Sequence, residues 1–328
     1  MAASTEKINV LITGGAGYIG SVLVDHILNL QCVAKVYVID NLLYKQESFL
    51  SHFKHSRDGR YEFVYGDVRD RQLLKKYCDK ADVVIPLAAI VGFPACEQNQ
   101  KLASEVNYEH VKFITETISK DQLIIYPNTN SGYGSSGAED FCTEESTLNP
   151  ISHYGITKCD AEREVLEEAN GVSLRLATVF GVSPRMRVDL LVNDFVYKAC
   201  VDKYIVLFQH NFKRNFIHVS DVSDAFCHFI LNNYIAPGYC RGEVFNAGLS
   251  SANLSKMELC ETIKQLVPDF VIKTEDFASD PDKRNYIVSN KKLEKLGWSP
   301  QFNIESGIKQ LICCYSGLKN IKTLHTNL

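Results

Sequence analysis

The stretch LITGGAGYIG at residues 11–20 constrains the fold of this chain more than any other feature of the sequence. Gly14, Gly17 and Gly20 follow an apolar run that predicts a β-strand over 8–13, and they begin a pattern of helical spacing over 20–30. In such a strand–turn–helix, the first glycine permits a tight turn and the second lets phosphate groups approach the backbone. The third lets the helix pack closely on the strand. A turn that binds nothing is the alternative.

An acidic residue strengthens the interpretation as a binding site. Asp40 ends the next expected strand, over 35–40, and comes 20 residues after Gly20. A carboxylate at this place accepts hydrogen bonds from the adenosine ribose hydroxyls of a dinucleotide. Because its charge repels a 2′-phosphate, the sequence predicts NAD rather than NADP as the cofactor.

Apolar runs and helical patterns alternate through the first half of the chain. Further strands are expected at 61–67, 81–89, 122–129 and 172–180, and further helices at 70–78, 102–119 and 154–170. This alternation predicts an α/β fold with a Rossmann-type, doubly wound parallel sheet. After Phe180, shorter elements separated by Pro, Gly and Asn indicate a smaller mixed α/β lobe. We expect an NAD-binding domain over 1–180, to which 215–247 partly returns, and a substrate-binding domain over 181–328.

The composition excludes several other classes of protein. An apolar content of 45% and a net charge of −4 are ordinary for a globular protein and indicate neither nucleic acid nor an anionic membrane as a partner. No apolar run is long enough to span a bilayer, and no leader is recognisable at the start, so we expect a cytoplasmic protein. The 11 cysteines are scattered without C-x-x-C spacing, which predicts reduced thiols and no metal site.

The G-x-x-G-x-x-G spacing, with DNL at 40–42, resembles the extended branch of the short-chain dehydrogenase/reductase superfamily, which acts on nucleotide sugars. The resemblance covers essentially the whole chain and implies NAD as cofactor. In the helix expected over 102–119, Asn107 matches a family asparagine that steadies the cofactor region. The other cofactor contacts that the resemblance implies are Gly14, Gly17, Tyr18, Ile19, Gly20, Asp40, Asn41, Asp67, Val68, Leu87, Ala88, Ala89, Tyr154 and Lys158.

Three residues form the expected catalytic set. Tyr154 and Lys158, in YGITK, are spaced i and i+4 and therefore share one face of a helix. An ammonium near a phenol lowers its pKa from about 10, so that the phenol can act as general base on a sugar hydroxyl. Thr129, at the end of the strand over 122–129, matches the catalytic Ser/Thr of the family. The alternatives are a solvated helix face for the pair and an ordinary turn residue for Thr129.

The resemblance also implies contacts with the substrate. Arg214 and Arg284 match arginines that bind a diphosphate, for which a planar guanidinium is well suited. SPR at 183–185 is similar to a segment of GDP-mannose dehydratases, which favours a guanine nucleotide and contacts from Arg185 and Arg187. The remaining residues expected at the substrate are Val91, Asn130, Ser131, Thr178 and Asn193.

Departures from the family pattern narrow the expected activity. The dehydratases of the family carry an Asp-Glu pair after the catalytic threonine, whereas this chain has Asn130 and Ser131, which argues against 4,6-dehydration. Several segments, among them IPLAAIVGFPAC and YPNTNSGYG, resemble those of the GDP-heptose 4-dehydrogenases of bacterial capsule biosynthesis. The expected reaction is NAD-dependent oxidation at C4 of GDP-D-glycero-α-D-manno-heptose. A nucleotide-sugar 4-epimerase and a cofactor-binding sensor are the alternatives. Because relatives often pair through the helices over 102–119 and 154–170, a homodimer is expected.

Overall fold

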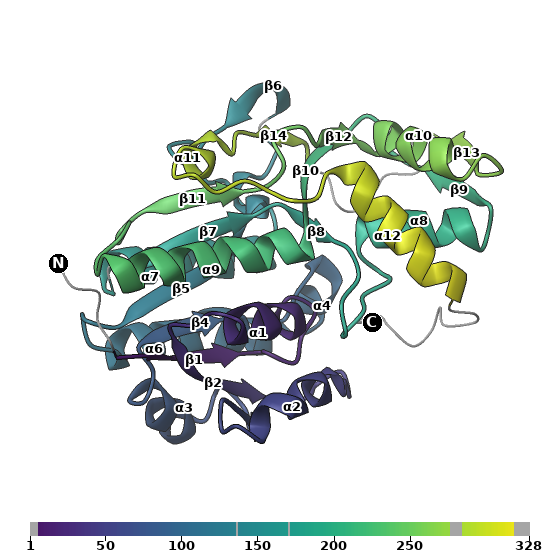
Figure 1. The fold of residues 1–328 in the computed structure, drawn as a ribbon. Coiled ribbons are helices and arrows are strands. Elements are labelled where there is room, and N and C mark those ends of the chain that lie inside the picture. The colour runs from purple at the N-terminus through teal and green to yellow at the C-terminus, as the bar shows by residue number, and fades with distance from the viewer. Residues whose placement is uncertain (1–5, 136, 170, 276–283, 318–328) are drawn as a thin grey trace.

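A seven-stranded parallel sheet forms the larger part of the computed structural model, which describes residues 6–135, 137–169, 171–275 and 284–317 (Figure 1). Its strands are β1 (Ile8–Thr13), β2 (Val33–Asp40), β3 (Tyr61–Tyr65), β4 (Val83–Pro86), β5 (Leu123–Thr129), β7 (Val172–Leu176) and β11 (Val244–Ala247). Their order across the sheet is β11-β7-β5-β4-β1-β2-β3, and every neighbouring pair is parallel. The predicted Rossmann-type, doubly wound sheet is therefore confirmed.

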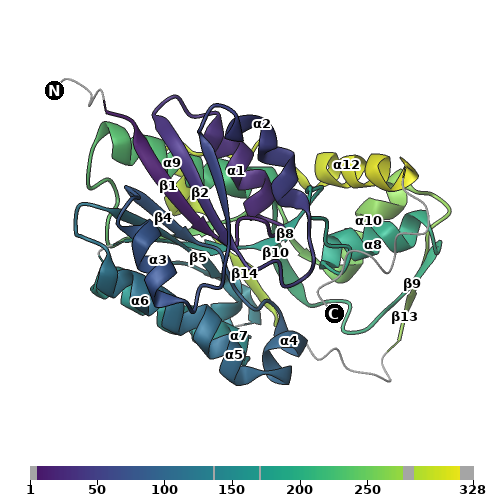
Figure 2. The same ribbon diagram turned by 90° about the horizontal axis from the view of Figure 1, so that it is seen from below.

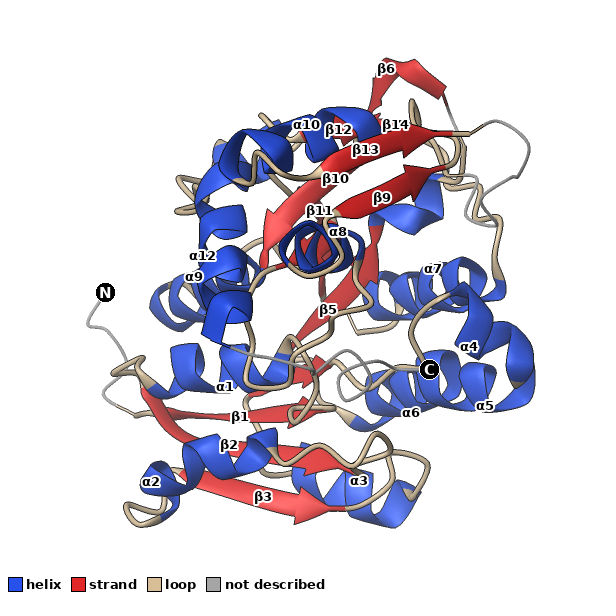
Figure 3. Ribbon diagram, turned by 90° about the vertical axis from the view of Figure 1, so that its right-hand side faces the viewer, coloured by secondary structure: helices blue, strands red, loops and turns tan. Residues whose placement is uncertain are grey.

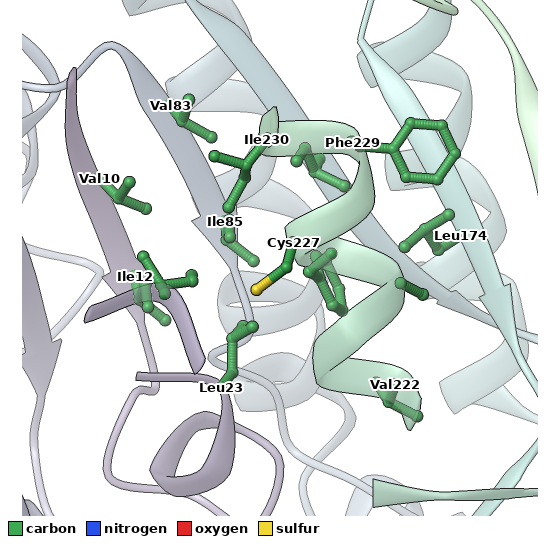
Figure 4. Packing of buried hydrophobic residues seen from close by; sticks show 14 of the residues in the cluster. Val10, Ile12, Leu23, Val83, Ile85, Leu174, Val222, Cys227, Phe229 and Ile230 are labelled. Atoms are coloured by element: carbon green, nitrogen blue, oxygen red, sulfur yellow. The ribbon is translucent and has the colours of Figure 1, made fainter. Parts of the chain in front are cut away.

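Helices cover both faces of this sheet (Figure 2). On one face lie α1 (Gly20–Leu28) and α9 (Val219–Ile235), and on the other lie α3 (Arg71–Cys78), α6 (His110–Thr117) and α7 (His153–Glu167). Side chains of β1 alternate between the two faces: Ile12 packs in the cluster around α9 and Leu11 in the cluster around α3 and α6. Figure 4 shows the first cluster, where Ile85 of β4 lies near Ile230 of α9. Because both faces are covered, the central strands β1 and β4 are mostly apolar, whereas β5 and β7 also carry buried polar residues such as Asn128 and Arg175.

The helix expected over 102–119 is interrupted. The chain forms α4 (Phe93–Gln98), α5 (Gln100–Ser104), a π-helical turn at Glu105–Glu109 and then α6. The π-helical turn places Asn107 inside the protein, where its amide bonds the backbone of Ile90. A π-helical turn accommodates one extra residue in a helix. Such an insertion depends on tertiary packing, which the periodicity of apolar residues does not reveal.

The strand expected over 172–180 is also divided, at Ala177. β7 stays in the large sheet, whereas β8 (Thr178–Phe180) pairs with β10 (Lys213–His218), and β10 also pairs with β12 (Asn253–Ser255). β10 therefore does not return to the large sheet, but α9 and β11, which follow it, do. The division of the chain into domains at residue 180 stays a prediction.

The second lobe packs around its own apolar cluster beside the carboxyl ends of the large sheet (Figure 1). This cluster is built mainly by α8 (Leu191–Cys200), α10 (Lys256–Leu266) and α12 (Ile304–Gly317). Figure 3 shows β9 (Tyr204–Leu207) and β13 (Val271–Thr274) side by side at the outside of this lobe. The remaining elements are 3-10 turns at Ser48–His52 and Asn130–Tyr133, α2 (Phe53–Ser56), β6 (Gly137–Cys142), β14 (Tyr286–Val288) and α11 (Lys291–Glu294).

Two further findings concern membrane spans and metal sites among the described residues. Among the residues that the structure describes, no helix combines the length and the apolar character needed to cross a membrane. The 11 cysteines are free thiols, and the described residues contain no cluster of His, Cys, Asp or Glu side chains suited to a metal ion.

Candidate active site

The glycine motif forms the turn between β1 and α1, at the carboxyl edge of the large sheet. Gly14 has a φ of +71°, and a Cβ at this position would lie 2.6 Å from the backbone nitrogen of Ala88, beyond β4. A Cβ on Gly20 would lie 2.6 Å from the Cα of Gly15, so that α1 begins directly against the turn. No side chain caps α1 at Ile19. The N-terminus of α1 can therefore receive an anion such as a pyrophosphate.

Asp40 is held rigidly beside this turn. Its Oδ2 accepts a hydrogen bond from the backbone N–H of Ala16 at 3.0 Å, and its Oδ1 accepts one from Leu42 at 2.8 Å and one from the Gln46 amide at 3.2 Å. Burial raises the pKa of the Asp40 carboxyl, while these backbone hydrogen bonds lower it. The carboxylate lines the cleft beside the glycine turn, and its contact with a cofactor ribose stays a prediction.

One cleft of about 820 Å³ extends from the glycine turn to the second lobe. All but three of the predicted site residues line it. Those expected at the cofactor are Gly14, Gly17, Tyr18, Ile19, Gly20, Asp40, Asn41, Asp67, Val68, Leu87, Ala88 and Ala89. Those expected in catalysis or at the substrate are Val91, Thr129, Ser131, Tyr154, Lys158, Thr178, Arg185, Arg187, Arg214 and Arg284.

The three remaining residues lie outside the cleft lining, and two of them hold loops through hydrogen bonds to the backbone. Asn107 fixes Ile90, as described above. Asn193 accepts a hydrogen bond from the backbone N–H of Gly181 at 3.0 Å and donates one to the carbonyl of Arg187 at 2.8 Å. Asn130 is buried, and its amide finds no hydrogen-bond partner among the described residues. Because none of the three lines the cleft, their expected contacts with cofactor or substrate are not supported by the structure.

The catalytic set comes from two neighbouring elements. Thr129 ends β5, and its hydroxyl donates to Ser131 Oγ at 3.0 Å and accepts from the Ser131 backbone N–H at 3.1 Å. Tyr154 lies in the first turn of α7, which Ser152 caps by accepting from the N–H of Gly155 at 3.2 Å. Lys158 lies one turn further along α7, so the spacing expected from the sequence brings these side chains to one wall of the cleft.

Burial determines the pKa values of this pair. Loss of solvation raises the pKa of Tyr154 to about 12, against the opposing charges of Arg284 and Arg187. Burial also lowers the pKa of Lys158 to about 7, and its Nζ lies 4.2 Å from the centroid of the Tyr126 ring. The expectation that Lys158 lowers the pKa of Tyr154 is therefore not met by the chain on its own. The ammonium is too deeply buried to stay fully charged at neutral pH.

Two acidic residues of the cleft are bound to arginines. Asp67 accepts from Arg69 Nε and Nη2, both at 2.9 Å, and this contact lowers the pKa of Asp67 to about 2. Asp189 pairs with Arg187 at 2.5 Å. Arg187 therefore reaches the cleft with its charge already balanced, a feature that the sequence motif did not predict.

Sequence reasoning missed many residues that line the cleft, and two of them bring polar groups into contact with other parts of the chain. Lys256, at the start of α10, is buried and donates to the carbonyl of Phe208 at 3.1 Å. Tyr44 follows the DNL motif, and its ring lies 5.3 Å from the guanidinium carbon of Arg185. No local pattern marks either residue, because each reaches the cleft through tertiary packing.

Comparison with known proteins agrees with this geometry. Residues 10–248 match the NAD dependent epimerase/dehydratase family. The chain belongs to this family. The predicted resemblance to extended short-chain dehydrogenases/reductases is thereby confirmed at the level of the family, and so is NAD as the cofactor of that family.

Relatives within the NAD dependent epimerase/dehydratase family match along nearly their whole length. The low-salt glycan biosynthesis protein Agl12 of Haloferax volcanii is 27% identical, over 94% of this chain and 99% of that protein. A putative UDP-glucose 4-epimerase of Methanocaldococcus jannaschii is 26% identical, over 92% and 97%. The crystal structure of a Bacillus anthracis dTDP-glucose 4,6-dehydratase in complex with NAD superposes with a TM-score of 0.79 at 24% identity, over 96% and 98%. Both epimerases and dehydratases therefore share this fold.

Proposed function

We propose that this protein uses NAD to oxidise C4 of a nucleotide-activated sugar. The observation that carries the proposal is that Thr129, Tyr154 and Lys158 line the same cleft as the glycine turn and Asp40. When bound, NAD supplies a hydride acceptor. The glycine turn and the N-terminus of α1 would hold its pyrophosphate, and Asp40 would hold its adenosine ribose.

The wall of the cleft formed by Thr129, Tyr154 and Lys158 would supply the groups that move the proton. Tyr154 would remove the proton from the C4 hydroxyl, and the Thr129 hydroxyl, held by Ser131, would orient that oxygen. Because burial keeps the pKa of Tyr154 near 12, positive charge must favour its phenolate. Arg284 and Arg187 act in this sense, and protonation of Lys158 at the neighbouring turn would add to their effect.

The test of this assignment is Tyr154→Phe. Turnover should fall by about 100-fold or more, the usual contribution of a general base, while NAD still binds. Thr129→Ser keeps a hydroxyl and serves as the matched control, with turnover near that of the wild type. Near-normal turnover of Tyr154→Phe would exclude Tyr154 as the base.

We further propose that the substrate is a GDP-sugar, GDP-D-glycero-α-D-manno-heptose, whose 4-keto product enters capsular polysaccharide biosynthesis. The support is the resemblance of SPR at 183–185 and of the segments around the catalytic residues to enzymes of GDP-sugars. Arg214, stacked 5.5 Å from the centroid of the Tyr286 ring, and Arg284, bonded to Ser131 Oγ, are proposed to bind the diphosphate. A panel of GDP-, UDP- and dTDP-sugars, with products identified by mass spectrometry and NMR, tests the choice.

A nucleotide-sugar 4-epimerase is the second candidate, and the similarity to a putative UDP-glucose 4-epimerase favours it. The same residues begin both reactions. The product distinguishes them: an epimerase yields a redox-neutral isomer, whereas a dehydrogenase leaves NADH and a keto sugar. A sensor without activity is disfavoured, because the catalytic set lines the cofactor cleft.

We also propose a homodimer formed through α6 and α7. These helices pack side by side (Figure 2), and Ile156 of α7 is 44% exposed at their outer face. An apolar side chain on such a face suits a helix–helix interface. Light scattering should give a mass of two chains for the wild type and of one chain for Ile156→Glu.

A further inference from the structure

The segment 181–187 connects β8 to the second lobe and lies against the cofactor side of the cleft. The Tyr18 hydroxyl donates to the carbonyl of Gly181 at 2.6 Å, and the Ser183 hydroxyl donates to the carbonyl of Tyr18 at 2.7 Å. The backbone N–H of Arg185 donates to Ser21 Oγ, in the first turn of α1, at 3.3 Å. This segment is therefore attached to the glycine turn and to the first turn of α1.

This attachment of the backbone sets the position of the Arg185 side chain. Arg185 is only 7% exposed, its Nη1 donates to the carbonyl of Met186 at 2.8 Å, and its guanidinium lies over Tyr44. Tyr44 belongs to the loop that folds around Asp40, and the charges of Asp40 and Arg185 interact. Arg185 thus lies at the adenosine end of the cleft, although the sequence places it among the substrate contacts.

The charges around Asp40, Tyr44 and the start of α1 favour the binding of an anion in this part of the cleft. The N-terminus of α1 carries partial positive charge, and Arg185, whose backbone bonds Ser21 in that first turn, adds a full positive charge beside Asp40 and Tyr44. Asp40 is already engaged by three N–H donors. A phosphate in the cleft would stabilise both positive groups, the N-terminus of α1 and the guanidinium of Arg185. Arg187 is held by Asp189 at 2.5 Å.

We propose that Arg185 binds the ADP half of NAD, at its pyrophosphate and adenosine ribose, and not the sugar nucleotide. This inference rests on the cofactor site of the proposed function and extends it in two ways. A residue of the second lobe then holds the cofactor in place, so that loss of Arg185 speeds NAD release. Its charge also offsets that of Asp40, so that Arg185 reduces the discrimination against the 2′-phosphate of NADP.

The experiment compares Arg185→Met with Arg214→Met, a buried arginine of the same cleft that is proposed to bind the diphosphate. Calorimetric titration of nucleotide-free protein with NAD should show a Kd about 10-fold or more higher for Arg185→Met, as expected for a lost charge-assisted hydrogen bond. Its Kd for GDP should stay within about twofold. Arg214→Met should show the reverse pattern. Weakened GDP binding with unchanged NAD binding in Arg185→Met would overturn the proposal.

A second measurement separates a cofactor contact from a structural role. The ratio of the Kd for NADP to the Kd for NAD should rise in Arg185→Met, because the charge of Asp40 is then unopposed. A merely structural defect would weaken both cofactors equally and would overturn the proposal. If Arg185→Met does not fold, Arg185→Lys, which keeps the charge but not the planar fork, should show a smaller loss in the same direction. Failure of the wild type to bind NAD would instead refute the cofactor site itself.

Discussion

Removing one partner of the buried ion pair between Glu162 and Arg175 should destabilise this protein strongly. Glu162 of α7 is 3% exposed, and its carboxylate accepts hydrogen bonds from Arg175 of β7 at 2.7 Å, from the Asn128 amide at 2.7 Å and from the Ser173 hydroxyl at 2.6 Å. Arg175 is itself 5% exposed. The pair joins α7, which carries Tyr154, to the strands beneath it.

Glu162→Gln keeps the shape of this side chain and removes its charge. Arg175 then remains as a buried cation without its carboxylate, and the new amide group points an N–H at the existing donors. Removing one partner of a buried pair costs roughly 3–5 kcal/mol of the free energy of unfolding. For a chain of 328 residues, that loss corresponds to a Tm lower by roughly 4–7 °C.

Thermal unfolding followed by circular dichroism measures the effect. Arg163→Ala is the matched control on the same helix, because Arg163 and Asp160 form an exposed pair with side chains 64% and 40% accessible. That pair is worth at most about 1 kcal/mol. The double variant Glu162→Gln, Arg175→Met should cost less than the sum of the two single changes. The reasoning is refuted if Glu162→Gln is no more destabilising than Arg163→Ala, or if the two single effects simply add.

Three further predictions follow from local geometry and burial. Gly14→Ala should cost at least about 1 kcal/mol and abolish NAD binding in calorimetry, because its φ of +71° and the Ala88 backbone leave no room for a Cβ; unchanged affinity would contradict the assigned turn. Ser255→Ala should lower the free energy of unfolding by about 1 kcal/mol in urea titrations, since it breaks the capping box with Glu258; a threonine at this position should restore most of it. Burial lowers the pKa of Lys158 to about 7 from 10.5, so between these values the unfolded chain holds a proton that the folded protein does not. The Tm of the wild type should therefore rise relative to that of Lys158→Met as the pH increases from 7 to 10, and a constant difference would argue against a buried, neutral lysine.

The sequence determined the features that depend on near neighbours. Alternating apolar runs indicated the main strands and helices of the first half of the chain, because the side-chain periods of 2.0 and 3.6 are local properties. The glycine turn, the Asp40 strand end and the i, i+4 spacing of Tyr154 and Lys158 were likewise readable, since each motif spans a single turn or element boundary.

Tertiary structure decided the features that distant segments create together. The division of the expected strand at Ala177 depends on β10, which lies far along the chain. The backbone of Arg185 lies against the first turn of α1 because Ser21 and Ser183 bond to it and to each other. The pKa of Tyr154 near 12 reflects what surrounds it in the folded protein. Burial and electrostatic potential depend on the whole arrangement of the chain, whereas hydrogen-bonded turns and side-chain periodicity are set within a few residues.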